Sequence, residues 1–259
     1  MEPILNQKLY SKADFSFNFR LNHQNVKLNF ELPFTEHVQE LRQRCLHFFV
    51  FFVFFSLFAF LDIKLIVELL ETPVNNIRFF QLSPGEYFIE TVKIAIYTGF
   101  ILTSPIFLSQ ITFFIIPGLT LNEKNLILPL LAGSTLLFFS SLFFSYFCLI
   151  PAALQFFISY SSGVIEPLWS FSQYCDFILV LFSTTGIAFQ IPIFQIILGI
   201  FGVISGTTML KLWKYVILFA VILGAILTPS TDPITQILLS SAIIILYLTG
   251  AGVLILFNR

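Results

Sequence analysis

Long apolar segments separated by short polar ones are the feature that most constrains the fold of this chain. Hydrophobic residues make up 57% of its 259 residues and charged residues only 10%, whereas a soluble domain carries about 25% charged residues. One water-soluble globule cannot hide so much apolar surface in its interior, so the remainder has to face lipid. The composition therefore predicts an integral membrane protein, and the net charge of −1 does not indicate a nucleic-acid partner.

Six apolar segments are candidates for membrane-spanning helices, each of which needs about 20 residues. They predict an all-α, polytopic membrane protein with six transmembrane helices, in a membrane domain of residues 34–259. The expected spans are residues 45–66, 92–116, 126–150, 177–200, 214–228 and 234–257. Pro105 and Pro192 should bend the second and fourth spans, and the break in the apolar pattern from Pro151 onward should end the third. Residues 1–33 are polar and mixed in charge, which predicts a flexible aqueous tail.

The fifth apolar segment is short for a bilayer of full thickness, and two explanations remain open. A span below the bilayer thickness thins the membrane locally or leans on partner helices. Alternatively, the helix begins earlier, near Leu210, and Lys211 and Lys214 extend their ammonium groups to the interface.

An even number of spans puts both termini on one side of the membrane, and the basic residues indicate which side. The side of the N-terminus would collect most of them, namely Lys8, Lys12, Arg20, Lys27, Arg42, Arg44, Lys124, Lys211, Lys214 and Arg259. The opposite side would hold only Lys64, Arg78 and Lys93. Since cytoplasmic loops are enriched in Lys and Arg, both termini are expected on the cytoplasmic side or its organellar equivalent, the stroma.

Residues able to do chemistry are scarce, which argues against an enzyme. All three histidines precede or open the first span, so no Ser–His pair forms deep in the later helices. The chain has no Gly-x-x-x-x-Gly-Lys-Ser/Thr loop for a nucleotide and no His-Glu-x-x-His metal motif. Its three cysteines lack a Cys-x-x-Cys spacing. We therefore expect no catalytic residues, no metal and no cofactor.

Two acidic residues on the side of the N-terminus are candidates for binding a cationic partner. Glu40 lies at the start of the first helix, where it is either in a surface ion pair with Arg44 or an acceptor for an incoming guanidinium. Glu123 lies in the polar loop after the second span and is either a solvated loop carboxylate or a second such acceptor. Two carboxylates on one face would suit two arginines, because a guanidinium binds a carboxylate through two hydrogen bonds.

Three polar side chains lie within the expected spans, and each needs a hydrogen-bond partner because the surrounding hydrocarbon offers none. Gln190 in the fourth span, and Gln110 and Lys93 in the second, either hold helices together or line a path through the protein. Asp232 lies in the turn before the sixth span, where we expect it to cap that helix and hold the short fifth one.

Several of these residues fall in motifs that resemble the TatC family, the core subunit of the twin-arginine protein translocase. Ahead of the first span the chain reads His37-x-x-Glu40-Leu41-Arg42-x-Arg44, and ahead of the second Leu82-Ser-Pro84-Gly85-Glu86-Tyr-Phe88 followed by Lys93. The second span and the loop after it carry Pro105, Gln110, Phe114, Pro117-Gly118-Leu119 and Glu123. Ile165-Glu-Pro167-Leu-Trp169-Ser and Leu227-Thr-Pro229-Ser-Thr-Asp232-Pro233 resemble the plastid and cyanobacterial branch. Several motifs in the right order, over about residues 34–257, make the resemblance specific.

What the resemblance implies is a receptor for protein transport. TatC proteins have six helices that form a concave wall, and both termini face the side where substrates start. The resemblance implies that Glu40 and Glu123 bind the paired arginines of signal peptides, with Arg42, Phe114 and Pro117 in the same patch. It also implies assembly with single-span TatA- and TatB-type subunits and with further copies of the chain, and transport of folded proteins driven by the proton gradient. The thylakoid membrane is the location that this branch implies, and a bacterial or mitochondrial inner membrane is the alternative.

Two other functions remain open at this point. A small-solute secondary transporter would use Lys93, Gln110 and Gln190 as polar points along a path. An assembly factor without transport activity would leave Glu40 and Glu123 dispensable. Gln190 also stands where many TatC proteins have Glu, so a role that needs an ionisable group at that depth is not carried over.

Overall fold

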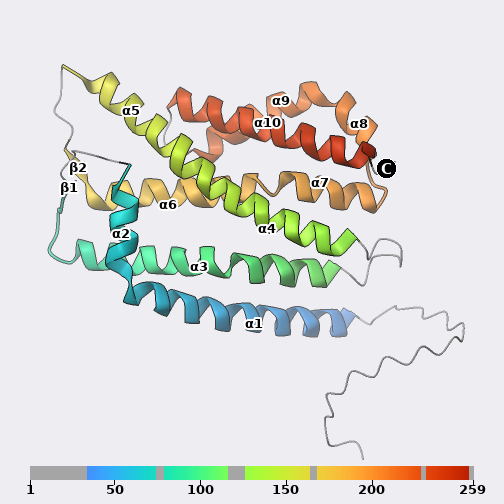
Figure 1. Cartoon of the computed structure of the whole chain (residues 1–259), viewed down its shortest axis with the longest axis horizontal. Coiled ribbons are helices and arrows are strands. Elements are labelled where there is room, and N and C mark those ends of the chain that lie inside the picture. Colours follow the sequence, from blue (N-terminus) through green and yellow to red (C-terminus); the bar gives the residue numbers. More distant parts are fainter. Residues whose placement is uncertain (1–33, 74–78, 116–125, 164–167, 229–231, 257–259) are drawn as a thin grey trace, which may run out of the picture. The chain divides into compact units, whose positions relative to one another are not determined.

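The computed structural model describes residues 34–73, 79–115, 126–163, 168–228 and 232–256, which are almost entirely α-helical (Figure 1). Among these residues, five helices are long and apolar enough to cross a membrane: Val38–Leu61, Glu86–Phe114, Ile127–Ser161, Phe171–Ile200 and Pro233–Leu256. A shorter apolar helix, Trp213–Leu227, takes the place of the fifth expected span. The order of these six helices agrees with the all-α membrane fold that the apolar segments predict.

The first helix differs from the expected span at both ends. Helix α1 (Phe34–Leu61) begins before residue 45 and stops ahead of Asp62, where a separate helix, α2 (Ile63–Glu71), changes direction (Figure 1). Helix α2 buries Val67 and Leu70 and exposes its opposite face, the pattern of a helix that lies on a surface and does not cross the bilayer. The polar residues around position 62 therefore end the span earlier than its hydropathy suggested.

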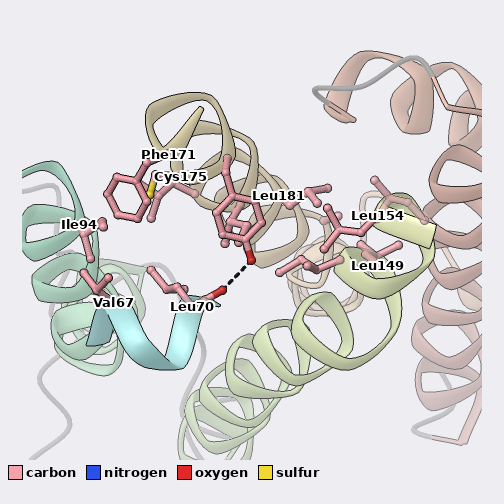
Figure 2. Close-up of a cluster of buried hydrophobic side chains, with 14 of the residues drawn as sticks. Val67, Leu70, Ile94, Leu149, Leu154, Phe171, Cys175 and Leu181 are labelled. Atoms are coloured by element: carbon pink, nitrogen blue, oxygen red, sulfur yellow. Dashed lines mark hydrogen bonds between the residues drawn. The ribbon is translucent and has the colours of Figure 1, made fainter. Parts of the chain in front are cut away.

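Two tyrosines from other helices hold the C-terminal end of α2. The Tyr146 hydroxyl donates to the Leu69 carbonyl at 2.9 Å, and the Tyr174 hydroxyl donates to the Leu70 carbonyl at 2.6 Å; Figure 2 draws the second bond at Leu70. The last carbonyls of a helix have no partner within the helix. These hydroxyls satisfy two of them and thereby fix α2 to the rest of the protein.

The second helix, α3 (Glu86–Ile115), runs through Pro105 without a break. A proline cannot donate to the carbonyl four residues earlier, which here is that of Ile101. The Ser104 hydroxyl donates to this carbonyl at 2.7 Å, so the carbonyl is not left without a hydrogen bond inside the helix.

The third helix continues past the position where the sequence predicts its end. Helix α4 (Ile127–Phe144) passes into a π-helical turn, η3 (Ser145–Leu149), and then into α5 (Ile150–Ser161). Pro151 is therefore the second residue of α5 and does not end the span at residue 150. A π-turn widens the backbone, and placed just ahead of the proline it makes room for the ring while the helix continues.

The fourth span is broken near the expected proline. Helix α6 (Phe171–Ala188) ends and α7 (Ile191–Ile200) begins on either side of Phe189 and Gln190, with Pro192 in the first turn of α7. The sequence predicts a bend at Pro192, and the structure shows an interruption of the helix just ahead of this proline, because the ring blocks the preceding turn.

The last three helices resolve the question of the short fifth span. Helix α8 (Gly206–Lys211) ends before α9 (Trp213–Leu227) begins, so the spanning helix does not extend back to Leu210. Its 15 residues correspond to about 22 Å, against about 30 Å for the hydrocarbon core. Helix α10 (Pro233–Leu256) follows at full length.

A pair of two-residue strands joins two loops that the sequence did not relate. Strands β1 (Phe79–Phe80) and β2 (Trp169–Ser170) pair in parallel, with Phe79 opposite Trp169 and Phe80 opposite Ser170. They precede α3 and α6, so the pairing fixes the starts of these two helices to one another.

The main buried cluster lies where α2, α3, the segment from η3 to α5, and α6 meet (Figure 2). The cluster includes Leu70 of α2, Ile94 of α3, Leu149 of η3 and Leu181 of α6, and none of the four is more than 7% exposed. Lipid is as apolar as these side chains, so close packing rather than exclusion of water stabilises such contacts in a membrane.

Candidate functional site

Glu40, near the start of α1, forms an ion pair with Arg44 one turn along the same helix. Both Nε and Nη2 of Arg44 donate to a single oxygen of Glu40, Oε1, at 3.1 and 2.5 Å. The two side chains are partly exposed, at 29% for Glu40 and 23% for Arg44. The surface ion pair that the spacing predicts is therefore present.

Arg44 also connects α1 to the end of α3. Its Nη1 donates to Gln110 Oε1 at 3.3 Å, and its Nη2 donates to the Phe113 carbonyl at 3.3 Å. The C-terminal end of a helix carries unpaired carbonyls and a partial negative charge, which favour a guanidinium. Gln110 is thus a polar contact between two helices at the end of the protein where α1 begins and α3 ends.

Aromatic packing and one glycine hold α1 against α3 below this polar contact. The Phe48 ring lies 5.0 Å from the Phe107 ring and 6.3 Å from the Phe100 ring, measured between ring centroids. Further along, a Cβ on Gly99 would lie 2.7 Å from Ser56 Cα, so only glycine allows the two backbones to approach this closely. The position of Glu40 relative to α3 therefore depends on a tightly packed helix pair.

The other members of the predicted patch are only partly placed. Arg42 is exposed on α1, and Phe114 is half-buried in the last turn of α3. Pro117 and Glu123 lie outside the residues that the structure describes. The structure therefore brings Glu40, Arg42 and Phe114 to the ends of two adjacent helices, and the geometry of the second acid stays a prediction.

Gln190 occupies the break between α6 and α7 and bonds to another helix. It accepts a hydrogen bond from the Ser134 hydroxyl of α4 at 2.6 Å and donates to the Ser134 carbonyl at 3.2 Å. It also lines three largely apolar hollows of about 280, 430 and 750 Å³. The first hollow lies between α3, α4 and α7, the second is lined mainly by α3 and α6, and the third lies between α7, α9 and α10. Gln190 thus holds two helices together at a point where the hollows converge.

Lys93 lies near the other end of α3 and forms ion pairs on two helices. Its ammonium group donates to Glu90 Oε1 at 3.0 Å and to Asp176 Oδ1 of α6 at 2.6 Å. Ser172 donates to the same Glu90 oxygen at 2.8 Å. Among the described residues, Gln190 lines the three hollows named above, and neither Lys93 nor Gln110 lines any of these three.

Asp232 is buried at the start of α10, with 1% of its surface exposed. Its Oδ2 accepts the backbone N–H of Thr235 at 2.9 Å, which is the helix cap expected from the sequence. Gln236, one residue further on, donates to the Val221 carbonyl of α9 at 3.4 Å and so joins the two helices.

From the sequence, no role was assigned to the two acidic residues that fix the start of α3. Glu86 accepts the backbone N–H groups of Leu82 and Ser83 at 2.5 and 3.2 Å, and the Ser170 hydroxyl at 3.1 Å. Glu90 is only 2% exposed and pairs with Lys93 three residues later. The spacing of this pair was a usable signal, whereas the contacts to Ser170 and Asp176 depend on the tertiary fold.

Comparisons with known proteins agree on one family. The family model described as TatC, Sec-independent protein translocase protein, matches residues 36–241. The chain is 53% identical over 258 residues to the uncharacterized tatC-like protein ycf43 of Trieres chinensis, covering 100% of this chain and 96% of that one. It is 45% identical over 231 residues to the chloroplastic Sec-independent protein translocase protein TATC of Pisum sativum, covering 88% of this chain and 65% of that one. The crystal structure of the twin-arginine translocase receptor TatC in DDM matches with a TM-score of 0.74 at 34% identity, covering 84% of this chain and 99% of that one.

Proposed function

This chain belongs to the TatC family of Sec-independent protein translocases, and from that premise we propose that the start of α1 and the end of α3 bind the paired arginines of signal peptides. The chain is a six-helix membrane protein and a core subunit of the twin-arginine translocase, located in a plastid or thylakoid membrane. It acts in the translocation of signal-peptide substrates together with other Tat subunits. The family is that of a translocase receptor subunit and is not a known enzyme family.

One observation carries the proposal: Glu40 offers a partly exposed carboxylate beside the end of α3. Its second oxygen, Oε2, has no hydrogen bond to any residue that the structure describes. A guanidinium binds a carboxylate more strongly than an ammonium does, because its planar fork donates two aligned hydrogen bonds. A signal arginine therefore has an open acceptor at this position.

The second arginine is assigned to Glu123, with Arg42, Phe114 and Pro117 in the surrounding patch. This assignment rests on the motifs of residues 114–123, which resemble those of the family. By the distribution of Lys and Arg, the patch faces the stroma, as do both termini.

The apolar stretch of a signal peptide, about 7–15 residues long, fits the hollow side of the same protein. The hollows of about 280 and 430 Å³ are lined by α3, α4, α6 and α7, with Phe107 and Ile187 common to both. A peptide anchored by its arginines at the end of α3 would extend along this apolar surface.

Partners of the translocase are assigned on the same basis. We assign this chain to an assembly with single-span TatA- and TatB-type subunits and with further copies of itself, because α9 is too short to match a full bilayer and shorter spans lean on neighbours. We assign transport driven by the proton gradient to this chain because the TatC family implies it.

Photo-crosslinking of a twin-arginine signal peptide to the purified protein in lipid tests the proposed site. With probes at positions 40 and 123, labelling should depend on both peptide arginines, and Glu40→Ala or Glu123→Ala should weaken peptide binding. Glu68→Ala is the control: Glu68 lies on the exposed face of α2, which follows the end of α1 opposite to Glu40. This variant removes the same negative charge and should bind the signal peptide normally. Equal labelling by a Lys-Lys peptide, or normal binding by both acid variants, would leave a subunit whose signal-recognition site lies elsewhere.

A further inference from the structure

The carboxylate that we assign to a signal arginine already holds an arginine of the same chain. Two N–H groups of Arg44 converge on Glu40 Oε1, at 3.1 and 2.5 Å, and this pairing is the one that an external guanidinium would have to share or replace. Arg42, two residues away, has no such contact with any described residue. The difference follows from helix geometry, because residues four apart lie on one face and residues two apart do not.

We infer that Arg44 is an internal competitor for Glu40, which lowers the affinity of the receptor for cationic signals; this inference rests on the proposed function of Glu40. In the free receptor Arg44 neutralises the carboxylate. A bound signal arginine takes over that carboxylate, and Arg44 moves to its other acceptors. The residue thus sets how tightly a signal is held and how readily it is released.

The contacts of Arg44 with α3 make this exchange feasible. Removing one partner of an ion pair is costly when the other charge is left without a hydrogen bond. Arg44 has two further acceptors, Gln110 Oε1 and the Phe113 carbonyl, both at 3.3 Å. These distances are at the long end for an N–H···O bond, so both bonds gain strength if the guanidinium moves toward α3. The displaced arginine is therefore still bound.

The free oxygen of Glu40 provides the starting point of the exchange. Because both N–H groups of Arg44 use Oε1, an incoming guanidinium first bonds to Oε2, which no described residue occupies. Two guanidinium groups on one carboxylate repel each other, and this repulsion drives Arg44 toward the end of α3. Because the side chains of the pair are partly exposed, the peptide has access to it from water.

The size and the selectivity of the effect follow from competition. An ion pair of this exposure shifts an equilibrium by roughly two- to fivefold. A competitor scales the affinity of every ligand for the site by the same factor, so Arg44 changes the tightness of binding without changing the preference for Arg over Lys.

Titration of fluorescent twin-arginine and twin-lysine signal peptides into the full-length receptor in lipid nanodiscs tests the inference. Arg44→Gln should bind both peptides about two- to fivefold more tightly, with their affinity ratio unchanged. Glu40→Gln should weaken binding, and the double variant Glu40→Gln with Arg44→Gln should bind like Glu40→Gln alone, because a competitor has no effect without its site. Lys211→Gln, which removes a positive charge from the exposed surface of α8, controls for net charge and should bind like the wild type.

The outcomes separate this inference from the proposed function. If Glu40→Gln weakens binding while Arg44→Gln weakens it or leaves it unchanged, Glu40 is a signal site and Arg44 is not its competitor. If Glu40→Gln has no effect, the proposed site itself is wrong. Should Arg44→Gln not fold, Arg44→Lys decides, because an ammonium retains the charge near Phe113 but gives up the paired contact with Oε1. Arg44→Lys should tighten binding by about twofold, and unchanged or weaker binding would overturn the inference.

Discussion

Gly99 offers a sharp test of how the α1–α3 contact supports the candidate site. A Cβ at this position would lie 2.7 Å from both Cα and N of Ser56, and ordinary contact begins at 3.4 Å. Because the obstacle is backbone, Gly99→Ala forces α1 and α3 apart by roughly 0.7 Å. Such overpacking costs about 1–3 kcal/mol, of which the better helix propensity of alanine returns about 0.5–1.

We expect this displacement to affect the contact between Arg44 and Gln110, where α1 begins and α3 ends. The contact between Arg44 and Gln110 is already 3.3 Å long, so separation of the helices would break it. We expect the unfolding temperature of Gly99→Ala in detergent to fall by roughly 2–6 °C, and the affinity for a twin-arginine peptide to change as well. Size-exclusion chromatography of heated samples measures the first quantity, and fluorescence titration the second.

Two further variants test whether the effect of Gly99→Ala comes from the close approach of α1 and α3. A Cβ on Gly252, within α10, would have no atom within 4 Å, so Gly252→Ala should be neutral or slightly stabilising. Adding Ser56→Ala to Gly99→Ala should not restore stability, because Ser56 Cα and N remain in place. If Gly99→Ala melts at or above the temperature of Gly252→Ala, the close approach of the two helices is not a constraint on the fold.

Three further substitutions address the remaining polar contacts. Asp232→Ala should cost about 1 kcal/mol by loss of the α10 cap, whereas Asp232→Asn keeps an acceptor and most of the stability; thermal unfolding and the level of accumulation in the membrane measure both, and normal values for the alanine variant would contradict the capping role. Lys93→Met should cost roughly 1–3 kcal/mol because it leaves the buried Glu90 carboxylate without its cation, and adding Glu90→Gln should restore most of the loss. Burial, reinforced by Glu68, raises the pKa of Glu71, so the folded state favours its protonated form and loses that advantage as pH rises through the raised pKa. Glu71→Gln should accordingly raise the unfolding temperature near about pH 8 and not near about pH 3, and a shift of equal size at both values would refute the assignment.

The sequence carried the features that depend on local chemistry. Hydropathy is sufficient to locate the six helices, because a helix in the hydrocarbon core needs apolar side chains along its whole length. The cap at Asp232 and the pair of Glu40 with Arg44 follow from spacing alone. The break near Pro192 follows from the missing N–H of proline.

Other features depend on neighbours that no local pattern identifies. Pro151 signals a helix end, yet the π-turn ahead of it lets the helix continue to Ser161, and such a turn has no sequence signature. The spacing of Glu90 and Lys93 indicates one partner of Lys93, but its second partner, Asp176, comes from α6 and is supplied only by the fold. The third acceptor of Arg44 is the backbone carbonyl of Phe113. Because every residue has such a carbonyl, the sequence does not identify this one as a partner.

The pairing of β1 with β2 has a consequence for biogenesis. Phe79 cannot pair with Trp169 until the segment that contains β2 has been synthesised. The hydrogen bonds from Ser170 to Glu86 and from Lys93 to Asp176 also cannot form before this later segment is present. Helices α1 to α3 therefore enter the membrane before this end of the protein is fastened, and contacts between residues so distant along the chain form slowly. A nascent chain stalled before residue 169 should consequently leave Glu90 open to insertion chaperones and membrane proteases, and release from that exposure should coincide with insertion of the fourth span.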